Sequence, residues 1–135
     1  MATGFNHFPQ IAERIKPFCQ RVVKETANQV QGWAKSEAPY KTGYLQGNIY
    51  KSDWESSDYG SGGIAGAPGS YLLPEVKPSN DTSAIVGAAA NYSGYLEFGT
   101  RYMPAQPYFY KAVELARPFF EGELGKLEAE LAASV

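Results

Sequence analysis

The direction of the chain is fixed by one short stretch, YLEFGTRYMPAQPYF at residues 95–109. It holds one glycine, two prolines and three tyrosines, a composition too rigid for an ordinary helix or strand. Gly99 can supply the left-handed residue that ends a turn of helix over residues 92–98. Pro104 and Pro107 stiffen the chain as it leaves that turn. We therefore expect this stretch to set the angle at which the next element departs.

The segment after this stretch is predicted to be a helix. Pro107 suits its first turn, and Pro118 should bend its middle. Its second half is acidic, which opposes the helix dipole and favours either a frayed, solvated end or a basic partner. Its apolar residues recur at steps of three or four: Phe109, Val113, Ala116, Phe120, Leu124, Leu127 and Leu131.

Another long helix is predicted near the start of the chain. Pro9 suits its first turn, Pro17 should kink it or split off a short leading piece, and Pro39 should end it. One apolar face extends over about six turns, through Ile11, Ile15, Phe18, Val22, Thr26, Val30 and Trp33.

The middle of the chain reads as strands. The segments 48–55, 71–77 and 82–89 are short, rich in β-branched or aromatic residues, and bounded by turn formers. The turn at 78–81 should join the last two as a hairpin. The order helix, strands, helix predicts one α+β domain over residues 1–135, a small antiparallel sheet with both long amphipathic helices on one face.

A glycine- and serine-rich stretch, SSDYGSGGIAGAPGS at 56–70, separates the first two predicted strands. We expect a long mobile loop or an extended hairpin tip. It is not a phosphate-binding loop, because it lacks a GK[ST] ending and no Lys or Arg occurs from Ser52 to Val76. We expect it to make assembly contacts.

Charge is distributed unevenly along the chain. The net charge is −2, which argues against a dedicated nucleic-acid binder. Residues 1–51 nevertheless carry seven Lys and Arg against three Asp and Glu, whereas residues 52–135 carry five against eleven. The basic part of one copy could attract the acidic part of another, a head-to-tail arrangement that can build rings. The alternative is that both charge sets are solvated faces.

The sequence offers few groups for chemistry. It has one histidine, His7, and one cysteine, Cys19, so we expect no disulfide, metal centre, cofactor or catalytic triad. The aromatic content is more informative: Tyr is enriched at protein–protein interfaces, and five tyrosines gather around the opening stretch. We expect no membrane contact, since no apolar run approaches a spanning length.

Two segments together resemble a known family. APYKTGYLQGNI, residues 38–49, and YSGYLEFGTRYMPAQPYFYKAV, residues 92–113, are similar in pattern and spacing to the two motifs of the phage tail-component family of long-tailed phage necks. With the flanking helices, the resemblance spans about residues 9–130. The chain departs from the family pattern at Tyr44, at Gly47 and in the length of the loop 56–70.

The resemblance implies a structural virion protein without enzymatic activity. It would form a homo-oligomeric ring in the neck, assembled in the bacterial cytoplasm, with DNA passing through the lumen. Its partners would be copies of itself, a head-completion or connector protein, and a tail terminator or tail-tube protein. Two alternatives stay open: a tail terminator or minor tail-tube protein, and a small phage enzyme or inhibitor that shares the fold.

The expected roles divide the candidate residues into three groups. The structural motif comprises Pro39, Thr42, Gly43, Leu45, Gly99, Pro104 and Pro107. The candidate subunit interface comprises Tyr95, Glu97, Arg101 and Tyr102, the basic Arg14, Arg21 and Lys24, and the acidic Glu121, Glu123, Glu128 and Glu130. The candidate loop contact to a neighbouring ring comprises Tyr59, Gly60, Ile64 and Pro68. Glu97 and Arg101 could also bridge across their turn.

Overall fold

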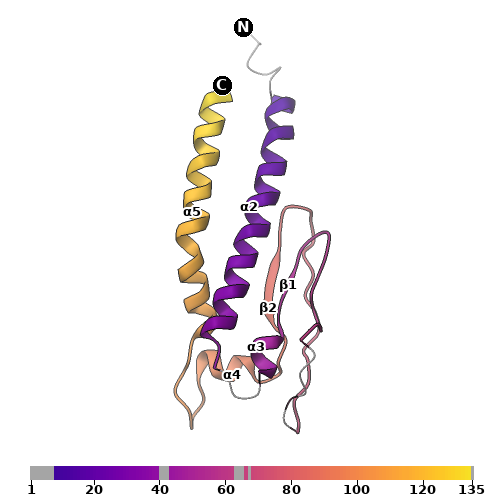
Figure 1. The fold of residues 1–135 in the computed structure, drawn as a ribbon, viewed down its shortest axis with the longest axis vertical. Helices are drawn as coiled ribbons and strands as arrows, with labels where there is room; N and C mark the ends of the chain where they lie inside the picture. Colours follow the sequence, from indigo (N-terminus) through magenta and orange to yellow (C-terminus); the bar gives the residue numbers. More distant parts are fainter. Residues whose placement is uncertain (1–7, 40–42, 63–65, 67, 135) are drawn as a thin grey trace.

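The computed structural model describes residues 8–39, 43–62, 66 and 68–134. Its elements in chain order are α2 (Phe8–Glu37), α3 (Tyr44–Gly47), β1 (Ile49–Ser52), β2 (Ile85–Ala88), α4 (Ser93–Phe98) and α5 (Tyr108–Ser134). Figure 1 shows α2 and α5 side by side, with the start of α2 and the end of α5 at the same end of the molecule. The predicted α+β class is confirmed.

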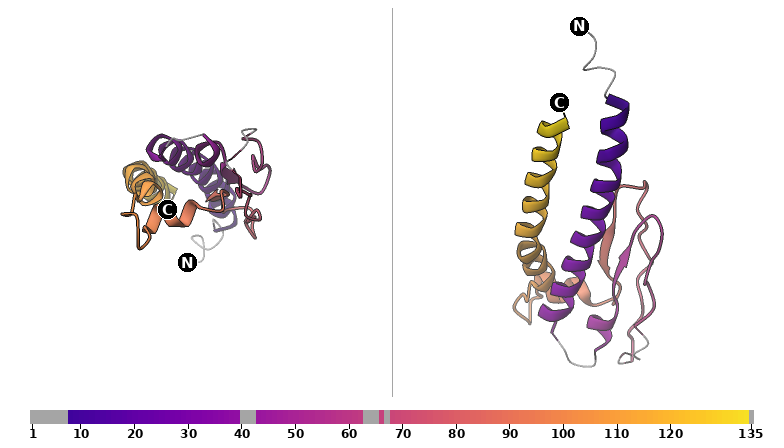
Figure 2. Two further views of the ribbon diagram at one scale, coloured as in Figure 1. Left: turned by 90° about the horizontal axis from the view of Figure 1, so that it is seen from below. Right: turned by 45° about the horizontal axis from the view of Figure 1, so that its top comes forward.

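Helix α2 runs unbroken through Pro17, so the predicted split does not occur. Its most deeply buried side chains are those of Ala34, Val22 and Ala27, which are 0%, 4% and 6% exposed. Trp33, predicted to face the core, is 41% exposed. Small residues allow close approach on both sides of a helix, and α2 has neighbours on both sides, α5 and the strands (Figure 2).

Helix α5 has the predicted position, but its buried face only partly coincides with the predicted apolar stripe. Tyr108, Ala112 and Ala116 are at most 3% exposed, and of these only Ala116 belongs to the stripe. Phe120 and Leu124, also in the stripe, are 37% and 44% exposed. These two side chains remain partly uncovered because α5 packs on α2 and α4 along one side.

The sheet consists of two antiparallel strands in the register Ile49↔Ala88 to Ser52↔Ile85. The predicted strand at 71–77 is wrong. Within this segment, which is fully described, only Leu72 forms a β-bridge, to Ala90. Pro74 explains the difference, since proline has no N–H to donate to a ladder. The predicted hairpin is therefore a turn whose two arms pair through this one bridge and not through a regular ladder.

The layers are ordered α5, α2, strands. We expected both long helices on one face of the sheet, but α2 alone packs on the strands and α5 packs on α2 (Figure 2). The elements converge below the sheet, where Ala34, Leu45, Ile49, Ala90 and Ala112 form the core. This end of the molecule also carries the turn 99–107.

Candidate functional site

The turn between α4 and α5 is held rigidly. Gly99 has φ +78°, and a Cβ built there would lie 2.7 Å from the Ala105 nitrogen. The Thr100 N–H donates to the Met103 carbonyl at 2.9 Å, and the Gln106 N–H donates to the Leu96 carbonyl at 2.7 Å. The positive φ predicted for Gly99 is confirmed, and a second constraint, close backbone approach, is added to it.

Glu97 caps the last helix. Its carboxylate accepts hydrogen bonds from the Phe109 and Tyr110 N–H groups, both at 2.9 Å. A negative charge at a helix N-terminus is favourable, and the two N–H groups would otherwise lack a helical partner. The predicted Glu97–Arg101 bridge is not formed, although both residues are described. Glu97 thereby ties α4 to α5.

Tyr108 lies under this turn and is 3% exposed. Its hydroxyl lies 3.5 Å from the Ser93 carbonyl. Burial, followed by the nearby charge of Glu97, raises the pKa of Tyr108 to about 12. The residue is therefore a neutral, packed anchor for the start of α5.

Four aromatic side chains project from this end into solvent; with Arg101 we call them the aromatic tip. Tyr95 and Tyr110 are each 63% exposed, Phe98 83% and Tyr102 89%. The Arg101 guanidinium lies 5.9 Å from the centre of the Tyr102 ring. Tyr95, Arg101 and Tyr102 belong to the predicted interface, whereas Phe98 and Tyr110 do not. The only sequence signal of Phe98 is its place directly before a turn glycine.

The family-like motif at 38–49 packs beside the one at 92–113. Gly43 has φ +80° and precedes α3, and Leu45 is 2% exposed in the core. The Tyr44 and Tyr92 rings, one from each motif, lie 6.3 Å apart. The structure therefore brings the two motifs together at the end of the molecule that carries the tip.

Three prolines of the predicted structural motif lie near helix ends or in the turn between helices. Pro39 comes two residues after the last residue of α2, and the Pro107 carbonyl accepts from the Lys111 N–H at 3.1 Å in the first turn of α5. Pro104 is exposed in the turn that connects α4 to α5. Thr42 falls outside the described residues.

The first half of the glycine-rich loop is attached to the domain. Asp58 accepts from the Lys51 N–H at 2.6 Å and from the Gln31 side-chain amide at 2.7 Å. The Tyr59 hydroxyl donates to the Leu73 carbonyl at 2.5 Å. Beyond it, Gly60 and Pro68 are exposed, and Ile64 lies outside the described residues.

Several of the predicted interface charges have partners within the chain. The Arg21 guanidinium lies 3.8 Å from the Glu123 carboxylate, and Lys24 pairs with Glu55. Glu123 also accepts from Lys126 at 3.0 Å and is 8% exposed. The remaining charges with described side chains, Arg14, Glu121 and Glu128, are exposed; the side chain of Glu130 is outside the described part.

A groove opens between the first half of α2 and the second half of α5; we call it the interhelix groove. Its volume is about 550 Å³. Its main apolar lining is Ile15, Phe18, Cys19, Val22, Phe120 and Leu124. None of the described residues that line it is a His, Asp or Glu, so this lining is suited to apolar contact rather than to acid–base chemistry.

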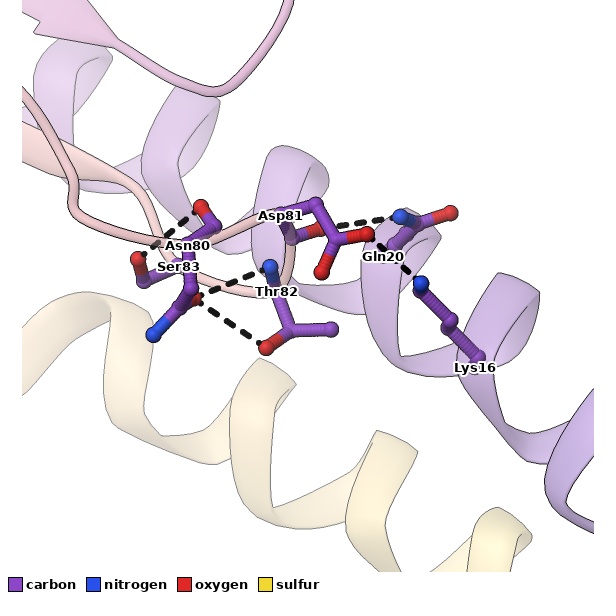
Figure 3. A network of polar contacts seen from close by, with 6 residues as sticks. All are labelled: Lys16, Gln20, Asn80, Asp81, Thr82 and Ser83. Carbon is purple, nitrogen blue, oxygen red and sulfur yellow. Dashed lines mark hydrogen bonds and ion pairs between the residues drawn. The ribbon is translucent and has the colours of Figure 1, made fainter.

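The turn at 80–83 forms one wall of the groove and is fixed to α2 (Figure 3). The Lys16 ammonium lies 2.6 Å from the Asp81 carboxylate, and the Gln20 amide donates to the Asp81 carbonyl at 2.8 Å. The hydrogen bond from Lys16 lowers the pKa of Asp81. Lys16, which also lines the groove, therefore has its charge balanced within the chain.

Other kinds of site find little support. Among the residues that the structure describes, no cluster of three or more His, Cys, Asp or Glu side chains could hold a metal ion. None of the described helices is both long and apolar enough to cross a membrane.

Comparison with known families gives one match. The model described as "Bacteriophage HK97-gp10, putative tail-component" matches residues 6–99, more than half of the chain. The match includes the whole first motif and ends at Gly99 within the second. Comparisons with curated proteins and with solved structures gave no significant match.

Proposed function

From the premise that the chain belongs to the HK97-gp10 family of bacteriophage tail components, we propose that it is a ring-forming subunit of the phage neck. In this role it joins the head connector to the tail and leaves a lumen through which DNA passes. It acts as a structural protein of the virion and not as an enzyme.

The aromatic tip is the observation that best supports an assembly role. Four large aromatic side chains, each at least 63% exposed, come from α4, the turn after it and the first turn of α5. Exposed apolar patches of this kind mark protein contacts, and Tyr and Arg are enriched among the residues that contribute most to binding. The backbone of the turn is held by hydrogen bonds, so little backbone conformational entropy is lost on contact.

The proposed partners are protein surfaces on three sides. Copies of the chain form the ring, a head-completion or connector protein lies above it, and a tail terminator or tail-tube protein lies below. DNA makes only non-specific passage, because a subunit with net charge −2 would not retain the phosphate backbone.

The glycine-rich loop is proposed to contact the neighbouring ring through its second half. Because Asp58 and Tyr59 form hydrogen bonds to the rest of the domain, deletion of the whole loop would also disturb the fold. A sharper variant is Ile64→Ser with Pro68→Ser, with Ser61→Ala as the control. The double variant should fold normally yet join heads to tails poorly; normal joining would refute this role for the loop.

Removing the chain from the phage that encodes it tests the function directly. The expected result is filled heads and complete but separate tails, restored to particles by the wild-type chain, with an epitope tag located at the neck. Tails of uncontrolled length would instead indicate a terminator. Normal particles without the chain would overturn a structural role.

A further inference from the structure

We propose that the aromatic tip of one copy binds the interhelix groove of a second copy. This inference rests on the self-association proposed above and names the two surfaces that perform it. The contact is heterologous: each copy offers a different surface to each of its two neighbours.

The groove has the character of a receptor for aromatic side chains. It is lined mainly by apolar residues from two helices, and it is open, since Phe120 and Leu124 remain 37% and 44% exposed. It is lined by α2, by α5 and by Thr82 of the turn at 80–83, and this turn is fixed to α2 by the Lys16–Asp81 pair (Figure 3). An apolar groove with fixed walls gains most from a rigid apolar insert.

The tip has the complementary chemistry, a group of exposed aromatic side chains. Phe98 and Tyr102 are the two most exposed large apolar residues that the structure describes, at 83% and 89%. Each aromatic side chain can bury roughly 150–250 Å². The groove volume of about 550 Å³ is in the range that accommodates a small group of side chains.

Charge also matches the two surfaces. Arg101 and Lys111 are exposed beside the tip, and neither has a carboxylate partner among the described residues. Glu121 and Glu128 are exposed on α5, three residues before and four after Leu124, so they lie next to the groove along one side of the helix. The tip thus carries cations to the acidic margin of the groove.

The position of the two surfaces excludes a contact within one copy. The tip lies where α5 begins, whereas the groove is formed by the second half of α5 and the first half of α2, at the other end of the molecule in Figure 1. In every copy the tip is therefore remote from that copy's own groove. Repetition of such a contact closes into a ring when the rotation permits.

Two variants separate the surfaces. The tip variant carries Phe98→Ser and Tyr102→Ser, and its control is Tyr71→Ser, another exposed aromatic at 61%. The groove variant carries Leu124→Lys. Its control is Leu115→Lys, which has the same 44% exposure on the opposite side of the same helix. Circular dichroism and thermal unfolding should show all four folded.

Light scattering after size exclusion measures the self-association of each variant. The wild type and both controls should form oligomers, and the tip and groove variants should each associate roughly tenfold more weakly or stay monomeric. An equal mixture of the two variants should then form a dimer and stop there. One copy still has its groove and the other its tip, so only one productive contact is available.

Cys19 reports which groove is occupied, because it is the chain's only cysteine and lines the groove. In the mixture, Cys19→Ser is added to the groove variant so that only the tip variant can be labelled. Maleimide labelling of Cys19 in the tip variant should slow several-fold when the groove variant is added. The control added in its place carries Leu115→Lys, Cys19→Ser and the two tip substitutions. It should leave the labelling rate unchanged, because it has no tip to insert.

Three outcomes would overturn the inference. They are a wild type that stays monomeric, variants that oligomerise normally, and variants that stay monomeric when mixed, the last indicating a symmetric or different contact. An apolar small molecule or another phage protein that protects Cys19 while the mixture fails to pair would assign the groove to that ligand instead. None of these results bears on whether the chain lies in the neck, which is tested separately in particles.

Discussion

Gly99 orients the aromatic tip through its backbone alone. Its φ of +78° with ψ of 172° is a conformation that side-chain-bearing residues rarely adopt, and a Cβ would lie 2.7 Å from the Ala105 nitrogen. Gly99→Ala should therefore lower the free energy of unfolding by about 2 kcal/mol or more. Gly94→Ala is the matched control, since no described atom lies within 4 Å of a Cβ there and φ is not positive. Urea denaturation should show no loss in the control, and equal stability of both variants would contradict the role of Gly99.

Tyr108 makes stability depend on alkaline pH. Its pKa is about 12 in the folded chain, above the ordinary value of 10.0. Between these values the unfolded state loses the proton first, so the stabilisation is complete below pH 10 and is lost as the pH rises towards 12. From pH 9 to 11.5 the wild type should lose roughly 1–2 kcal/mol more than Tyr108→Phe. Tyr102→Phe, at an exposed position, should follow the wild type. At pH 7 the Tyr108→Phe change should cost little, because the hydroxyl hydrogen bond is long, at 3.5 Å.

At the scale of elements, the stability of α5, which extends from the tip to the groove, depends on its first turn. Glu97 accepts from two N–H groups there, so Glu97→Ala should cost about 1–2 kcal/mol in urea denaturation. Glu97→Gln should fall between Glu97→Ala and the wild type, because it keeps an acceptor but loses the charge. The control is Glu114→Ala, which removes a partly exposed pair with Arg117 and should cost less than about 0.5 kcal/mol. A cost for Glu97→Ala as small as the control's would show that the cap is unimportant.

The presence of both long helices could be predicted from the sequence, but the face that each helix buries could not. The spacing of apolar residues gave both long helices their correct positions, and turn chemistry identified Gly43 and Gly99. The stripe through Phe120 and Leu124 is truly periodic, yet these two side chains lie at the margin of the contact with α2, where they line the interhelix groove, because a period does not specify the partner. The strand predicted at 71–77 is absent because Pro74 interrupts the ladder, even though the segment has the aromatic and β-branched residues that are typical of strands.

At the scale of the whole molecule, the order of layers decides what remains uncovered. A helix–strand–helix sequence is compatible with two helices on a sheet, whereas here α2 separates α5 from the strands (Figure 2). This arrangement also brings basic α2 beside acidic α5, which explains why Arg21 pairs with Glu123 inside one copy. The charge asymmetry of the sequence thus serves the fold first. Among the predicted interface charges with described side chains, those exposed without an ion-pair partner in the described chain are Arg14, Arg101, Glu121 and Glu128.

Those exposed acids make assembly sensitive to salt. If cations of a neighbouring copy approach Glu121 and Glu128, then Glu121→Lys with Glu128→Lys should weaken self-association roughly 3- to 10-fold at low ionic strength. The wild type should also weaken between about 0.05 and 0.5 M NaCl, because salt screens exposed pairs, and the double variant should lose most of that dependence. Glu25→Lys with Glu37→Lys is the matched control: it makes the same change in net charge at exposed positions of α2. Sedimentation measurements should show a much smaller effect of the control. If both double variants weaken association equally, net charge alone is responsible, and the acidic end of α5 is not a contact surface.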